Sequence, residues 1–243
     1  MEEFKKFDRQ LLKNCSNLIF NKYGRHIPVP DSDAIYARRD YVNYRLGASF
    51  QQLGFLIQIA DSQAKQYESV KGDSGDKILF TMKAIKQVSY CLDNLIFNLA
   101  SMSDYVGNYL GLLIYGPNFQ TIKWKGLVNK TNEMHREHEF GKLLSSEHKD
   151  WFTRLHGYRG DIIHKKAIMV EVEGFTNTRM LPDAVDSLNF IVNDSLKRYF
   201  HMIRNKNNMS VVECAHRFAE RTITGLSNLL RASETLNIRS KNA

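Results

Sequence analysis

The chain is poor in the residues and motifs that usually announce a protein's class. Its 3 cysteines in 243 residues, Cys15, Cys91 and Cys214, stand singly without C-x-x-C spacing. This pattern excludes a disulfide framework and a cysteine-rich zinc site, and it favours a reducing compartment. No apolar run approaches the roughly 18 residues of a transmembrane helix, and the first residues contain no signal-peptide hydrophobic stretch. The sequence therefore predicts a cytoplasmic protein without a membrane partner.

Motifs for nucleotide binding and for serine hydrolysis are also missing. The sequence contains no G-x-G-x-x-G, no phosphate-binding P-loop and no G-x-S-x-G. We therefore expect no cofactor. Apolar residues at 43% and charged residues at 25% are ordinary values for a folded globular chain. The net charge of +8 favours a polyanionic partner such as RNA, although a basic excess also occurs on solvated faces.

Only 4 prolines interrupt the chain, and long helical patterns lie between them. Asp31, Ser32 and Asp33 can cap the first long helix. The turn KGDSGD separates it from a second one, so the two predict a long antiparallel helical hairpin. The apolar stripe of the first helix is Ile35, Val42, Leu46, Ser49, Leu53, Leu56, Ala60 and Tyr67, and that of the second is Ile78, Met82, Ile85, Val88, Leu92, Leu95, Leu99, Met102 and Val106.

The second half of the chain predicts shorter elements. After a polar connector, a helix is expected over Glu147 to His164, and alternating apolar and acidic residues predict a short extended segment or hairpin near 168–173. Two further helices are expected near 186–205 and 210–236. The fold class is therefore all-α, a helical bundle with a long antiparallel helical hairpin and one short extended excursion.

The domain organisation predicted from these patterns is simple. We expect one mainly helical domain over 1–243, in which an N-terminal helix within 1–30 is an appendage and 210–236 form a C-terminal helix.

One charged pair lies on an otherwise apolar helix, in the segment RLHGYRGDIIHKK. Arg159 falls within the apolar stripe, only about 40° from Leu155 on the helical wheel. His164 lies about 140° further round and about 7.5 Å along the axis, so the two side chains diverge in a straight helix. Unwinding near Gly160, or a two-fold pairing of two copies of the helix, would bring such groups together. The alternative is an arginine whose long stem reaches from the core edge to water.

The helical hairpin followed by a helix with R-x4-H resembles the HEPN superfamily of helical nucleases and nucleotide-binding modules. The resemblance covers about 75–205, with its specific part in 151–164. It implies a metal-independent endoribonuclease, a toxin or defence effector, that cleaves single-stranded RNA as a homodimer. It implicates Arg159 and His164 as catalytic residues and leaves an antitoxin or regulatory protein as an unidentified partner. The position after the arginine, commonly polar in active members, is Gly160 here, followed by Asp161.

Two other groups of residues carry weaker signals. Trp124 between Lys123 and Lys125, expected in a loop, could stack a base while the lysines contact phosphates; the alternative is a tryptophan that pins the loop to the bundle. His135 and His138 have the spacing of metal ligands on one helical turn, but no third ligand is recognisable, so no metal site is predicted. Three functions remain open: the endoribonuclease, a non-catalytic HEPN-like module that binds nucleic acid or a partner protein, and a structural adaptor.

Overall fold

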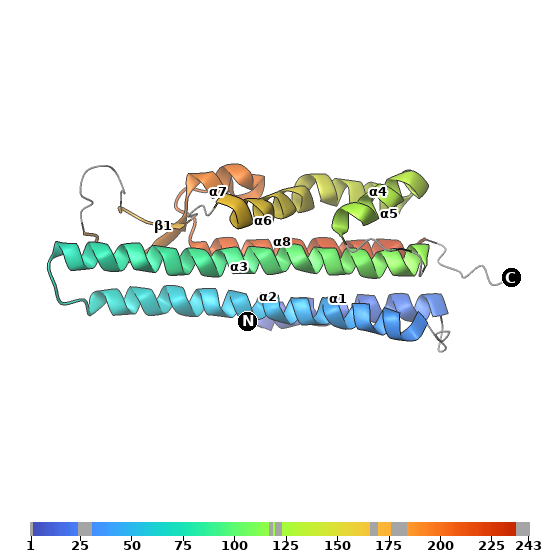
Figure 1. The fold of residues 1–243 in the computed structure, drawn as a ribbon, viewed down its shortest axis with the longest axis horizontal. Coiled ribbons are helices and arrows are strands. Elements are labelled where there is room, and N and C mark those ends of the chain that lie inside the picture. The colour runs from blue at the N-terminus through green and yellow to red at the C-terminus, as the bar shows by residue number, and fades with distance from the viewer. Residues whose placement is uncertain are drawn as a thin grey trace. The chain divides into compact units, whose positions relative to one another are not determined.

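The computed structural model describes residues 2–23, 31–116, 119, 123–165, 170–175 and 184–236. Most of them are helical, and one two-stranded antiparallel sheet is present in the described chain (Figure 1). This confirms the all-α class. The elements are α1 (Glu2–Tyr23), α2 (Asp31–Glu68), α3 (Ser74–Tyr115), α4 (Trp124–Met134), α5 (Glu139–Glu147), a π-helical turn (His148–Phe152), α6 (Thr153–Lys165), β1 (Val170–Val172), β2 (Phe190–Val192), α7 (Asp194–Tyr199), a 3-10 turn (His201–Ile203) and α8 (Val211–Ser233).

The chain divides into two compact units, and the long helices α2, α3 and α8 contribute to both. Unit 1 consists of Met1–Ala48, Asn98–His156 and Ala219–Ala243. Unit 2 consists of Ser49–Phe97 and Gly157–Phe218.

Helices α2 and α3 form the predicted antiparallel hairpin. In unit 2 a short turn at 69–73 joins them (Figure 1). In unit 1 the Arg38 guanidinium bonds the Asn108 side chain, and Arg45 bonds that of Asn98. A later residue of α2 thus pairs with an earlier residue of α3, as antiparallel helices require.

The apolar stripe predicted for α2 is buried at all eight positions. In α3 the stripe is buried from Val88 onward, but near the turn the prediction is wrong, because Met82 is exposed and Thr81 and Ala84 are buried instead. Thr81 tolerates burial because its hydroxyl donates to the Lys77 carbonyl at 2.9 Å. A polar residue with a local acceptor can therefore displace an apolar one from the buried face.

Helix α1 is an integral part of unit 1 rather than an appendage. Cys15 and Leu18 are buried, and the Tyr109 hydroxyl of α3 donates to the Cys15 carbonyl. The Asn14 amide donates to the Ser227 carbonyl of α8 at 3.3 Å. Breaking these bonds would leave buried polar groups unpaired, which is costly. The bonds therefore hold α1 in place in addition to its apolar packing.

The single helix predicted near 186–205 is wrong. The chain there first forms β2, which pairs antiparallel with β1, and only then the short α7. Phe190 and Val192 are buried, as β-branched and aromatic residues of a half-buried strand usually are. The Asn193 side chain then caps α7 by accepting from the Leu196 amide at 3.0 Å. The excursion predicted near 168–173 is confirmed as β1, although 168 and 169 lie outside the described residues.

The predicted polar connector before α6 is largely helical, since it contains α4 and α5. Two glycines of α3, Gly107 and Gly111, lie where this connector packs against the helix. A Cβ on Gly107 would lie 3.3 Å from the Cα of Trp124, and one on Gly111 would overlap the Phe119 ring. Both glycines therefore let later segments of unit 1 approach α3 closely. Helix α3 ends only at Gly116, whose φ of +85° suits glycine.

Among the described residues, no helix is long and apolar enough to cross a membrane.

Candidate functional site

The second half of α6, in unit 2, carries the predicted Arg–His pair. Arg159 is half-buried and follows Tyr158, which is buried against Tyr199 and Phe200 at ring-centroid distances of 5.5 and 5.6 Å. His164 lies in the last turn of the same helix, and its side chain lies outside the described part of the structure.

Helix α6 is continuous through Gly160 to Lys165. The backbone therefore does not unwind near Gly160, and the positions of Arg159 and His164 stay about 140° apart on the helix. A Cβ at Gly160 would meet no heavy atom within 4 Å, so no close contact explains the glycine. Of the two geometries that would unite the pair, only the pairing of two copies of the helix remains.

A half-buried carboxyl on α3 bonds the residue of α6 that precedes Arg159. The Tyr158 hydroxyl donates to Asp93 Oδ1 at 3.0 Å. Burial raises the pKa of Asp93 to about 6, although the hydrogen bond from Tyr158 opposes the shift. Asp93 is not among the site residues predicted from the sequence. Its position on the helical wheel could have identified it, because Asp93 lies within about 60° of Ser89 and Ile96 on the buried face of α3.

The Asp93 carboxyl predicts a pH-dependent stability. Its pKa in the folded chain lies above its ordinary value of 3.8, so folded protein retains the proton between about pH 4 and pH 6. Its contribution to stability is therefore full below about pH 4 and is lost as the pH rises through about 6. Asp93→Asn still accepts from Tyr158 but cannot ionise. We expect the free energy of unfolding of Asp93→Asn in urea, relative to that of the wild type, to increase as the pH rises from 4 to 7.

The exposed Asp61 of α2 supplies the control for this measurement, because Asp61→Asn removes a carboxylate that has no such burial. A difference between Asp93→Asn and wild type that is the same at every pH would contradict the assignment.

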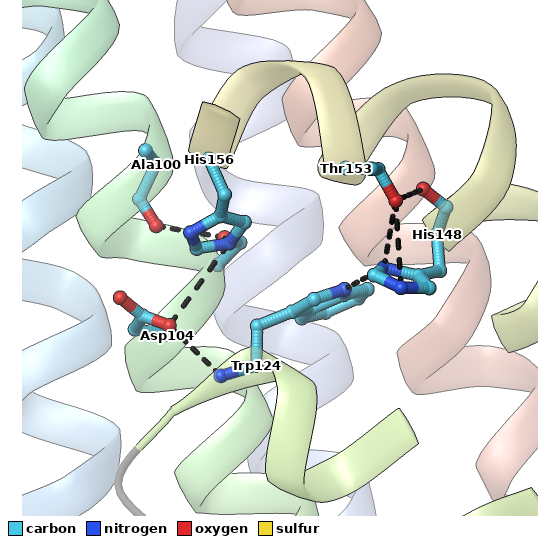
Figure 2. Close-up of polar contacts among 7 residues, drawn as sticks. Ala100, Asp104, Trp124, His148, Thr153 and His156 are labelled. Carbon is cyan, nitrogen blue, oxygen red and sulfur yellow. Dashed lines mark hydrogen bonds and ion pairs between the residues drawn. The ribbon is translucent and has the colours of Figure 1, made fainter. Parts of the chain in front are cut away.

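A polar cluster in unit 1 joins α3, α4, the π-helical turn and the start of α6 (Figure 2). The Ser103 hydroxyl donates to the Ala100 carbonyl at 2.7 Å and lies 2.8 Å from His156 Nε2. Asp104 Oδ1 lies 3.9 Å from the same His156 nitrogen and accepts from the backbone amide of Trp124 at 2.8 Å. His156 Nε2 and the Ser103 hydroxyl are therefore within hydrogen-bonding distance.

This cluster has the residue types of a serine hydrolase but not the arrangement. In such a site the carboxylate bonds Nδ1 of the histidine while the serine contacts Nε2. Here Ser103 and Asp104 both approach Nε2 of His156, and Ser103 is fully buried. Asp104 instead acts as the cap of α4, because Lys123 at the N-cap position makes no side-chain cap bond. The cluster therefore holds α4 and α6 on α3.

Trp124 lies at the centre of the same cluster. It is 1% exposed, and its ring centroid lies 4.3 Å from that of Phe152. Its Nε1 donates to His148 Nδ1 at 3.1 Å (Figure 2). Burial lowers the pKa of His148, and the charge of Lys125 lowers it further. A stacked base needs an accessible ring face. The base-stacking role predicted for Trp124 is therefore incompatible with its position, and the pinning alternative describes it.

The two lysines that flank Trp124, which were predicted to contact phosphates, are exposed, whereas the indole is buried. Lys123 and Lys125 are both exposed, so they remain available for phosphate contacts. Trp124 also begins α4 rather than lying in a loop. The predicted three-residue RNA-binding cluster therefore reduces to two surface lysines.

The two histidines with metal-like spacing do not share a helical turn. His135 ends α4 and stacks on Tyr115 at 5.8 Å, whereas the His138 Nδ1 caps α5 by accepting from the Phe140 amide at 3.1 Å. The part of the chain that the structure describes contains no group of three or more His, Cys, Asp or Glu residues able to hold a metal ion.

Comparison of the chain with protein-family models, with curated proteins and with solved structures gave no match.

Proposed function

We propose that the chain is a metal-independent endoribonuclease of the HEPN type, a cytoplasmic toxin or defence effector. The observation that carries the proposal is the position of Arg159, half-buried on a helix that ends one residue after His164 in an all-α bundle. From the edge of the core of unit 2, the long side chain of Arg159 can reach a phosphate at the surface. The Asp93 carboxyl, bonded to the residue before Arg159, gives the same region a titratable group whose pKa is raised.

The chemistry suits an arginine and a histidine. RNA cleavage without a metal removes the proton of a 2′-hydroxyl, whose oxygen then attacks the adjacent phosphorus. The bond from phosphorus to the 5′-oxygen breaks, that oxygen takes up a proton, and a 2′,3′-cyclic phosphate remains. His164 transfers these protons near neutral pH, and Arg159 holds the phosphate through two N–H donors.

The proposed enzyme is a homodimer. Because α6 is continuous, the Arg159 and His164 positions on one helix diverge, and one copy supplies half of a site. Two copies of α6 related by a two-fold axis would place two arginines and two histidines around one phosphate. The dimer is therefore part of the mechanism.

The test is cleavage of single-stranded RNA in the presence of a chelator. We expect the chain to sediment as a dimer at micromolar concentration and to cleave RNA in EDTA, leaving 2′,3′-cyclic phosphate ends. A strand with 2′-deoxyribose at the scissile nucleotide should resist cleavage, because it lacks the nucleophile. Activity lost with EDTA, or a chain that stays monomeric while it cleaves, would rule out this mechanism.

The alternative is a non-catalytic module of the same shape that binds nucleic acid or a partner protein. The observation that favours it is Gly160, which occupies the position after Arg159 although the structure leaves room there for a side chain. A purified dimer that binds RNA but cleaves none of the strands tested would establish this alternative.

A further inference from the structure

The first half of α2, in unit 1, exposes an unusual number of tyrosine rings. Tyr36 is 40% exposed, Tyr41 54% and Tyr44 68%. Single exposed apolar residues are normal on a surface, but three large rings within nine residues are not. Arginines alternate with them. We call the surface formed by Tyr41, Tyr44 and Arg45 of α2 with Tyr105 of α3 the tyrosine–arginine face.

The core does not need these rings. Val42 and Leu46, on the opposite side of the helix, are fully buried and attach α2 to unit 1. Tyr44 lies about 160° from both of them on the helical wheel. Its ring therefore remains in water in the isolated chain, and burying it against a ligand would be favourable.

The rings and the guanidinium groups are already stacked. The Arg45 guanidinium lies 5.6 Å from the Tyr44 ring centroid and 5.4 Å from that of Tyr105. The Tyr105 ring lies 5.6 Å from that of Tyr41. The Asn98 amide oxygen accepts from Arg45 at 3.2 Å, which fixes the guanidinium between the rings. The face is thus preorganised, and binding costs little additional side-chain entropy.

A second stacked cation on α2 lies outside the face. The Arg39 guanidinium lies 4.9 Å from the Tyr36 ring centroid. It also forms an ion pair with Asp40 at 2.8 Å, so its charge is partly neutralised. Because Arg39 is about 120° from Arg45 on the helical wheel, Arg45 is the guanidinium of the face that can contact a phosphate.

We propose that the tyrosine–arginine face binds single-stranded RNA. Bases stack on exposed aromatic rings with little sequence preference, while guanidinium groups contact the phosphates between them. A second copy of the chain would bring like-charged arginines together on this face, whereas RNA complements them and the net charge of +8. The choice of RNA over other single strands rests on the proposed function. The binding surface itself does not depend on cleavage.

The experiment uses a fluorescent single strand of about 15 nucleotides with 2′-O-methyl groups throughout, which cannot be cleaved. Its affinity for the full chain is measured by anisotropy and should fall steeply as the salt concentration rises. We expect Tyr44→Ala and Tyr41→Ala each to weaken binding about 10-fold or more, because a base loses its stacking partner. Tyr44→Phe keeps the ring and should bind within about 2-fold of the wild type.

The matched control is Tyr90→Ala on α3, because Tyr90 is 63% exposed and lies outside the face. It should bind as tightly as the wild type. Equal loss in Tyr90→Ala, or no loss in Tyr44→Ala, overturns the proposal. Tyrosine variants that dissociate a dimer in sedimentation without losing RNA would identify a protein interface instead. Because the strand cannot be cleaved, its affinity is measured whether or not the chain is a nuclease, so failure of the catalytic proposal remains distinguishable from failure of this one.

Discussion

Replacing Arg159 or His164 by alanine should each reduce RNA cleavage by about 100-fold or more. Loss of Arg159 removes the group that holds the phosphate and stabilises the charge that develops on it. Loss of His164 removes the group that transfers protons. Because the two act on one phosphate, the double variant should be little worse than either single variant. Cleavage is measured in EDTA as the rate of cyclic-phosphate formation.

The controls for this pair come from the same unit. Arg204 and His201 are exposed, and their alanine variants remove an arginine and a histidine that lie outside α6. Both should cleave at the wild-type rate. Sedimentation and circular dichroism must show that Arg159→Ala and His164→Ala remain folded dimers. If these two variants retain activity, another pair of residues performs the chemistry, and Asp93 becomes the first to replace.

Periodicity predicted the long helices well because their cores are continuous. The stripe of α2 is buried along its whole length, and the helix predicted over 210–236 is present as α8, in which Val211, Phe218 and Leu226 are buried. Over such lengths the pattern of burial outweighs local propensity. The same rule was wrong near 186–205, where a three-residue strand and a six-residue helix contain too few residues to reveal a period.

The site predictions depended on facts that no one-dimensional pattern contains. The sequence KWK suggests an exposed ring between two cations, but Gly107 lies on a neighbouring helix and allows α4 to approach until Trp124 is buried. The capping of α4 by Asp104 joins residues 20 positions apart in the chain. The exposure of Tyr36, Tyr41 and Tyr44 could have been read from the α2 wheel, because none of them falls on its apolar stripe.

Trp124→Ala should destabilise the chain by about 3–5 kcal/mol, the usual cost of deleting a buried tryptophan. The side chain is 1% exposed and packs on Phe152, so its removal opens a cavity in unit 1. His148 Nδ1 also loses the donor that it now has at 3.1 Å. The free energy of unfolding is measured by urea titration. Trp124→Phe keeps a ring beside Phe152 and should lose less, which gives a measurable value even if the alanine variant does not fold.

Lys123→Ala and Lys125→Ala are the matched controls, because both side chains are exposed on either side of the indole. Each should change the free energy of unfolding by no more than about 0.5 kcal/mol. A base-stacking Trp124 would give the opposite pattern. In that case Trp124→Ala would fold with wild-type stability and lose about 1–3 kcal/mol of RNA-binding free energy. Because the indole is enclosed by Phe152, Gly107 and His148, we expect the loss to fall on folding, and Trp124→Phe to bind RNA as the wild type does.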